Sequence, residues 1–324
     1  MDSFGRIIDY LRVSVTDRCN ERCLYCMPEG YKGWAQRQDH LSAAEIIQVV
    51  AAASQIGFRK IRLTGGEPLL RHDLEEIATA IWNLPGIETL GLSTNGTRLK
   101  DRARGLRQSG IRSLNVSLDA LDPDLYRKIT GGPLDAVLEG LRAAQLENFE
   151  VIKLNSVLMR GVSETELLPL VRFAAKNEMP IRFIELMPLS RSDVLDPARF
   201  LPVGEAMLRL SEDSPLEPLH DYRPGHGPAR YYRHSRTGAK IGFIGALTTP
   251  HFCESCNKLR LTADGKIRPC LGQHGELDLR PSLRQGSPLG LLKENLLEAI
   301  RHKPENHLMS DCYAPGRPMT AIGG

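Results

Sequence analysis

The chain has 324 residues, of which 25% are charged, and its formal net charge at pH 7 is only +3. This length allows one large α/β domain with a small appendage, and so small a net charge gives no general attraction to nucleic acid or a membrane surface. We therefore expect neither partner, and any anion site must be built from a local cluster of cations. The sequence shows no secretion leader and no apolar run of about 18 residues, which favours a cytoplasmic setting.

Short aliphatic runs alternate with helix-like segments in the first part of the chain. Strands are predicted to start near Arg12, Lys60, Glu88, Arg112, Val151 and Ile181. Apolar residues recur at helical spacing over 71–82, 98–109, 134–147 and 164–175. Ser42 and Glu45 form a capping box that opens a further helix after the first strand. Six such units predict a parallel sheet, and because six cannot close an eight-stranded barrel, we expect an α/β fold of the partial (β/α)6 TIM type.

The composition changes towards the C-terminus, where Pro, Gly and His become dense through 215–228. We predict a barrel domain over residues 1–220 and a second region over 221–324. Four of the seven cysteines fall in the second region: Cys253, Cys256, Cys270 and Cys312. Two clusters of cysteines in a cytosolic chain favour metal or redox chemistry over disulfides.

The first cysteine cluster follows the first predicted strand and consists of Cys19, Cys23 and Cys26. Three thiolates can hold three irons of a [4Fe–4S] cube, whose usual ligands are four cysteines, and one iron is then left open. A zinc site normally takes four ligands and this loop supplies no fourth, so zinc or structural thiols are the weaker alternative. The spacing, with Tyr25 before the last cysteine, is similar to the cluster motif of radical S-adenosylmethionine (SAM) enzymes.

Other candidate motifs also fall at the ends of predicted strands, where such folds collect their chemistry. Gly65 and Gly66 follow the second strand, and without a Cβ they let backbone polar groups approach a ligand. A plain turn is the alternative. Beside the cysteine loop the pair resembles the glycine-rich motif that holds the amino group of SAM, and Ser117 and Met187 would complete that site.

A second triad of cysteines lies in one stretch: Cys253, Cys256 and Cys270. We interpret it as the ligand set of a second cube with an open iron. A zinc site would need a further ligand, for which His251 and His274 are candidates. Cys312 is either an ordinary thiol or a fourth ligand.

Cations accompany the predicted strands. Lys258 and Arg260 alternate with leucines, which places both cations on one strand face. Five more cations lie on or beside barrel strands: Arg12, Lys60, Arg62, Lys153 and Arg182. If Lys258 and Arg260 stood alone, a solvent-exposed strand face would explain them. Cations that point into the barrel need an anion partner, because unpaired buried charge is costly. A polyphosphate would neutralise them.

The whole chain, from Asp17-Arg18-Cys19-Asn20 through both triads to the terminal Gly-Gly, resembles the GTP 3′,8-cyclases, the radical SAM enzymes that open molybdenum-cofactor biosynthesis. The resemblance implies cyclisation of GTP to (8S)-3′,8-cyclo-7,8-dihydroguanosine 5′-triphosphate, with SAM and two [4Fe–4S] clusters as cofactors. It further implies a flavodoxin- or ferredoxin-like electron donor and product transfer to a cyclic pyranopterin monophosphate synthase. A homodimer is expected only from base rates. Another radical SAM enzyme with an auxiliary cluster, such as a peptide-modifying maturase, is the alternative.

By position, the resemblance assigns roles to individual residues. The N-terminal cluster would be held by Cys19, Cys23 and Cys26, and the auxiliary cluster by Cys253, Cys256 and Cys270, its open iron binding the guanine. The expected SAM contacts are Tyr25, Gly66, Ser117 and Met187. The expected GTP contacts are Arg12, Lys60, Arg62, Ser93, Lys153, Arg182, Lys258, Arg260 and Arg268. Catalytic support is expected from the tail, namely Arg317, Gly323 and Gly324.

Two of these positions depart from the family pattern. Ser93 stands where threonine is expected, and the hydroxyl is kept. Lys258 stands where arginine is usual, so a single ammonium replaces a bidentate fork. We expect the second change to affect affinity for GTP and not the chemistry.

Overall fold

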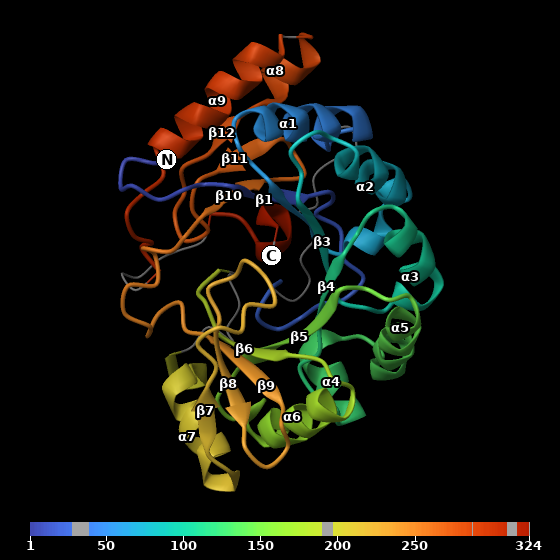
Figure 1. The fold of residues 1–324 in the computed structure, drawn as a ribbon, viewed down its shortest axis with the longest axis vertical. Coiled ribbons are helices and arrows are strands. Elements are labelled where there is room, and N and C mark those ends of the chain that lie inside the picture. The colour runs from blue at the N-terminus through green and yellow to red at the C-terminus, as the bar shows by residue number, and fades with distance from the viewer. Residues whose placement is uncertain (28–38, 190–196, 287, 310–315, 324) are drawn as a thin grey trace.

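The computed structural model describes residues 1–27, 39–189, 197–286, 288–309 and 316–323 (Figure 1). The strands are β1 (Tyr10–Ser14), β2 (Lys60–Thr64), β3 (Thr89–Thr94), β4 (Ser113–Ser117), β5 (Val151–Leu158), β6 (Ile181–Glu185), β7 (Leu216–Pro218), β8 (Arg230–His234), β9 (Lys240–Ile244), β10 (Lys258–Leu261), β11 (Lys266–Arg268) and β12 (Leu277–Asp278). The helices are α1 (Ala43–Gln55), α2 (Leu74–Trp82), α3 (Leu99–Gln108), α4 (Pro123–Thr130), α5 (Leu134–Leu146), α6 (Leu167–Lys176), α7 (Val203–Asp213), α8 (Arg280–Arg284), α9 (Leu289–Arg301) and α10 (Met319–Ile322).

All these strands form one twelve-stranded sheet in the order β12-β11-β10-β1-β2-β3-β4-β5-β6-β9-β8-β7. The strands β1 to β6 are parallel neighbours, which confirms the predicted partial (β/α)6 barrel. Two strands from the C-terminal third continue this parallel core: β10 beside β1, and β9 beside β6. Antiparallel strands follow at both edges, and among the described residues no pairing joins β12 to β7, so the sheet stays open.

Helices cover the outer face of the curved sheet, and the C-terminal tail lies inside the curve (Figure 1). The period of two in each strand explains this arrangement. On β1, Leu11 and Val13 are fully buried in the hydrophobic core beneath the helices, while Arg12 points to the opposite, inner face. The inner face is therefore polar, and it provides the surfaces for a site.

Local sequence signals set several helix ends. The capping box at α1 is confirmed, since the Ser42 hydroxyl accepts from the Glu45 amide and the Glu45 carboxylate accepts from the Ser42 amide. The segment predicted as one helix over 164–175 begins as a 3₁₀ turn and becomes α6 only at Leu167. The sequence patterns did not predict α4, α7, α8 or α9. None of the helices in the described part of the chain has the length and apolar character needed to cross a bilayer.

Candidate active site

The first cysteine triad lies in the loop that follows β1. The amides of Cys26 and Met27 both donate to the Cys23 carbonyl, at 3.0 and 3.2 Å, and fold the loop into a turn. Burial raises the pKa of the Cys19 thiol to about 12. Burial and the charge of Cys19 together raise the pKa of the Cys26 thiol to about 12. The pKa of Cys23 is also raised, by burial and by negative groups that include both other cysteines. Three thiols whose charges raise one another's pKa ionise together only beside positive charge, so the donor set fits an iron–sulfur cluster.

Gly65 and Gly66 pack against the backbone just before this loop. The Gly66 amide donates to the Thr16 carbonyl at 2.8 Å, and the Glu67 amide donates to the Arg18 carbonyl at 2.7 Å. A Cβ on Gly66 would lie 2.3 Å from the Arg18 carbonyl oxygen, so only glycine fits there. The motif therefore also fixes the position of the cysteine loop, a role that its sequence did not reveal.

Glu67 ties the ends of β2 and β3 together from a fully buried position. Its carboxylate accepts from the Thr94 hydroxyl at 2.6 Å and from the amides of Asn95 and Leu69 at 2.7 and 3.0 Å. Burial raises the Glu67 pKa to about 7, although these hydrogen bonds act to lower it. The Asn95 side chain then donates to Asn20 at 3.0 Å, which connects the network to the cysteine loop.

The residues expected at the SAM site approach the same mouth of the barrel. The Tyr25 hydroxyl donates to Asp119 at 2.8 Å, and Asp119 lies two residues after Ser117, the end of β4. Asp119 also accepts from the Val157 amide at 2.7 Å, and burial raises its pKa to about 6. Met187 follows β6 and packs on a small cluster of Leu189, Ala246 and Met309. The four expected SAM residues thus belong to loops and strand ends on one side of the sheet.

Four arginines form a row across adjacent strands on the inner face: Arg268, Arg260, Arg12 and Arg62. The register pairs Arg260 with Arg268, Arg12 with Arg260, and Arg12 with Arg62. Burial, together with the neighbouring Arg260, lowers the pKa of Arg12 to about 9. Burial likewise lowers the pKa of Arg260 to about 10. The row concentrates positive charge on the inner face of a protein of small net charge.

Tyr10 lies one layer below this row, paired in register with Lys258 on one side and Lys60 on the other. Its hydroxyl accepts from Arg62 Nε at 2.7 Å, and the Lys258 ammonium lies 5.4 Å from its ring centroid. Lys60 forms an ion pair with Asp9 at 2.6 Å. Tyr10 is not among the site residues predicted from the sequence, although its position two residues before Arg12 already placed it on the same strand face.

Lys153 and Arg182 extend the cationic surface to β5 and β6. Lys153 is 1% exposed, and its ammonium donates to the Pro224 carbonyl at 2.8 Å. Burial lowers its pKa to about 6, with Arg62 and Arg182 adding to the effect. Ser93 lies in the same register row, since it pairs with Asn115 and Asn115 pairs with Lys153.

The second triad lies at the opposite end of the same strands. Cys253 and Cys256 precede β10, whereas the first triad follows β1, and these two strands are parallel. Cys270 follows β11, which runs antiparallel to β10, and so returns to the same end. The arginine row therefore lies between the two cysteine triads.

Lys303 lies beside the second triad, and the sequence did not indicate this role. Its buried ammonium donates to the carbonyls of Lys258 and Pro269, at 2.9 and 2.6 Å. Burial alone would raise the Cys256 pKa, but the charges of Lys303 and Lys258 outweigh it and lower that pKa. Lys303 is far from the cysteines in sequence, so no local pattern could have found it.

Within the described residues, no three His, Cys, Asp or Glu side chains form a site for a single metal ion.

The tail reaches the first triad from inside the barrel. The Thr320 amide donates to the Cys26 thiol, and the Gly323 carbonyl accepts from Arg260. Gly323 lies against Ser14 and Thr64, the last residues of β1 and β2. Gly324 and Cys312 lie outside the described residues.

Comparison with known proteins agrees with this geometry. The profile described as the radical SAM superfamily matches residues 13–174, and the one described as Molybdenum Cofactor Synthesis C matches residues 179–309. The GTP 3′,8-cyclases of Pelotomaculum thermopropionicum and Moorella thermoacetica are 42% and 40% identical to the chain, over all of it and 99% of each relative. The chain belongs to the GTP 3′,8-cyclase family. The resemblance to the GTP 3′,8-cyclases that the sequence indicated is thus confirmed.

The fold is also shared more widely than this cyclase family. The solved structure of Streptococcus suis SuiB bound to S-adenosylmethionine is similar with a TM-score of 0.62, covering 92% of this chain and 64% of that one. Its sequence identity is only 15%, so the similarity concerns the fold alone. This similarity therefore does not favour the alternative, a different radical SAM activity, over the activity named for the GTP 3′,8-cyclase relatives.

Proposed function

We propose that this chain is a radical SAM enzyme that cyclises GTP to (8S)-3′,8-cyclo-7,8-dihydroguanosine 5′-triphosphate, the first step of molybdenum cofactor biosynthesis. The observation that carries the proposal is the arginine row between two cysteine triads at opposite ends of the same parallel strands. Such an arrangement holds a polyanionic substrate between two metal centres. The full-length relatives named GTP 3′,8-cyclase support GTP as that substrate.

The N-terminal site fits a [4Fe–4S] cluster held by Cys19, Cys23 and Cys26. When bound, this cluster supplies the electron that cleaves SAM and so generates the radical needed at the ribose. The chain's own contribution there is to fix the cysteine loop through Gly66 and Glu67 and to bind SAM through Tyr25, Gly66, Ser117 and Met187.

The substrate site is proposed to use the inner-face cations: Arg12, Lys60, Arg62, Lys153, Arg182, Lys258, Arg260 and Arg268, with Ser93. Arginines give phosphate oxygens paired hydrogen bonds, whereas Lys153 and Lys258 act as point charges. Together they would fix the ribose in one place, which is the main contribution that positioning makes to such a reaction. Gly323 and Gly324 would border the reacting atoms without side chains.

A second [4Fe–4S] cluster is proposed at Cys253, Cys256 and Cys270, in the region over 221–324, with Lys303 beside it. The buried ammonium of Lys303 offsets negative charge on the three thiolates. We further propose a flavodoxin- or ferredoxin-like electron donor, transfer of the product to a cyclic pyranopterin monophosphate synthase, and a homodimer.

Anaerobic turnover of the reconstituted protein with SAM and dithionite tests the activity. GTP should stimulate 5′-deoxyadenosine formation and be consumed to the cyclised product, while ATP, CTP and UTP serve as matched controls. Failure of GTP to stimulate, in protein that holds about eight irons per chain, would contradict the substrate assignment. Cys270→Ser should lower the iron content to about four per chain and keep SAM cleavage, yet abolish cyclisation. Cys19→Ser is its control, because it should abolish SAM cleavage itself.

A further inference from the structure

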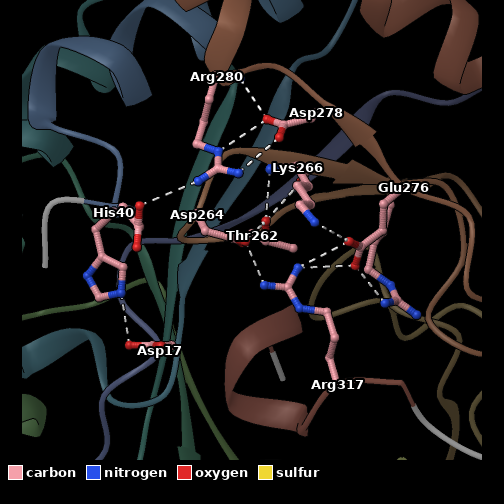
Figure 2. Close-up of polar contacts among 11 residues, drawn as sticks. Asp17, His40, Thr262, Asp264, Lys266, Glu276, Asp278, Arg280 and Arg317 are labelled. Carbon is pink, nitrogen blue, oxygen red and sulfur yellow. Dashed lines mark hydrogen bonds and ion pairs between the residues drawn. The ribbon is translucent and has the colours of Figure 1, made fainter. Parts of the chain in front are cut away.

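Arg317 attaches the C-terminal tail to the sheet through two carboxylates, Asp264 and Glu276 (Figure 2). Its Nη2 atom donates to Asp264 Oδ2 at 2.7 Å. Its Nη1 atom lies 3.2 Å from each carboxylate oxygen of Glu276. The guanidinium is therefore held from two directions, by two different segments of the chain.

The two carboxylates are themselves fixed by neighbours on the sheet. Asp264 lies in the turn between β10 and β11, where its Oδ1 accepts from the Thr262 hydroxyl at 2.7 Å. Glu276 precedes β12, and its Oε1 also accepts from Arg268 at 2.8 Å. Lys266 adds a weaker ion pair to Glu276 at 3.4 Å. Each of the two carboxylate groups thus has at least one donor besides Arg317 that helps to fix its direction (Figure 2).

These acidic groups stay ionised despite being largely buried. Burial acts to raise the pKa of Glu276, but Arg317 and Arg268 outweigh it and lower that pKa. For Asp264, Thr262 and Arg317 outweigh burial in the same way and lower its pKa. Arg317 therefore faces two negative charges under ordinary conditions.

The tail beyond Arg317 makes its contacts inside the barrel. Only Pro318 separates Arg317 from α10, whose Thr320 amide donates to the Cys26 thiol. Ile322 is 1% exposed, and the Gly323 carbonyl accepts from Arg260. A shift of Arg317 would therefore move the groups that border both the first triad and the arginine row.

We propose that Asp264 and Glu276 are positioning residues that hold Arg317 and thereby place residues 319–323 in the reaction site. Glu276 has a second role, because it also binds Arg268 of the arginine row. It therefore links the position of the tail to the cations that hold the substrate. This inference rests on the proposed function, since it assigns these residues to the cyclisation of GTP.

Hydrogen exchange of the tail amides tests the positioning without any substrate. Asp264→Asn and Glu276→Gln keep the shape of each side chain and remove its charge. Both should raise exchange of the 319–323 amides by at least about fivefold, while exchange in α1 stays unchanged and reports an intact fold. Asp278→Asn is the matched control, because Asp278 lies on the same sheet edge but pairs with Arg280 and not with Arg317. Unchanged exchange in the two variants, or an equal rise in the control, would overturn the proposal.

Steady-state kinetics with GTP test the second role of Glu276. Asp264→Asn should lower kcat by about tenfold and raise the KM for GTP by less than Glu276→Gln does, because it reaches the arginine row only through the contact of Gly323 with Arg260. Glu276→Gln should lower kcat and raise KM more strongly, because the ion pair that holds Arg268 loses its negative charge. An equal rise of KM in both variants would overturn the link to the substrate cations. If the wild-type protein does not convert GTP, the proposed function fails, whereas the exchange experiment still decides whether these carboxylates hold the tail.

Discussion

Arg12 and Arg260 are direct register partners on the parallel strands β1 and β10, and both are half-buried with lowered pKa values, of about 9 and about 10. Arg62 and Arg268 continue the row on either side. Like charges packed this closely repel one another, and the repulsion is strong because little water is present. Glu276 already pairs with Arg268 at one end of the row. For the rest of the row we expect an electrostatic cost in the protein without substrate, which a bound polyanion would remove.

Replacing one arginine of this row should stabilise the protein and abolish its response to GTP. Arg12→Met keeps much of the side-chain volume and removes a charge, so the thermal midpoint without GTP should rise by about 2 °C, or roughly 1 kcal/mol. The rise in midpoint that GTP causes in the wild type should disappear. Thermal unfolding of the reconstituted protein, with and without GTP, measures both effects.

Arg59→Met is the control for this comparison. Arg59 is half-exposed and pairs with Glu88 on the outer surface at 3.5 Å, so its loss should change neither quantity by more than about 0.5 kcal/mol. A lower midpoint for Arg12→Met than for the wild type would show that the row is satisfied without an anion.

Lys153 predicts a pH dependence of GTP binding. Burial, together with Arg62 and Arg182, lowers its pKa to about 6, so it is mostly neutral in the protein at pH 7.5. A bound triphosphate favours the charged ammonium, and binding should therefore take up as much as one proton. Affinity for GTP should fall as pH rises above about 6, by no more than about tenfold per pH unit.

Calorimetry of GTP binding at pH 7.5, in buffers of different ionisation enthalpy, counts these protons. Lys153→Met should remove the uptake. The same lowered pKa affects stability with a definite sign: between about 6 and the ordinary 10.5 the unfolded chain binds more protons, so this group makes the unfolding free energy rise with pH. Proton release on GTP binding would contradict the assignment of Lys153 to the triphosphate.

The barrel was predictable because its signals are local. Strand and helix periods depend on neighbouring residues, and the six predicted strands begin within two residues of the observed ones, the largest difference being β1, which begins at Tyr10 rather than near Arg12. The alternation around Lys258 was correct as well, since Leu259 and Leu261 are fully buried on the face opposite the cations.

The way in which distant segments of the chain meet at the site could not be predicted in the same way. The pairing of β10 with β1 joins segments far apart in the chain, and no local pattern states which strand edge a distant strand will meet. The same applies to Lys303, Asp264 and Glu276, which are ordinary charged residues until the fold places them beside a cysteine or Arg317. The resemblance assigned residues to ligands, but it did not indicate the residues that hold those side chains in place.

Lys258→Arg should strengthen GTP binding. Lys258 donates to Asn257 at 2.9 Å and lies over the Tyr10 ring, and it offers a phosphate only one ammonium. An arginine offers a bidentate fork, so KM for GTP should fall by about threefold to tenfold with kcat unchanged. Lys240→Arg, a lysine over Tyr222 on the surface, is the matched control and should change nothing. A higher KM for Lys258→Arg would mean that Tyr10 and its neighbours are shaped around the smaller ammonium.

Lys303 links three segments of the chain around the second cysteine triad. It follows α9, donates to the backbone of Lys258 on β10 and of Pro269 beside Cys270, and its charge lowers the pKa of Cys256. At 3% exposure its ammonium has almost no contact with water. The residue therefore combines a structural role with an electrostatic one.

Lys303→Met should weaken both roles together. Two carbonyls lose their donor, which predicts a loss of about 2–6 kcal/mol in unfolding free energy, because each unsatisfied group costs roughly 1–3 kcal/mol. The three thiolates of the second triad lose the nearby positive charge, so reconstituted protein should retain nearer four than eight irons per chain. Urea unfolding and iron analysis measure the two effects, with Lys293→Met on α9 as the control. Full iron content in a destabilised Lys303→Met protein would limit this lysine to the backbone contacts.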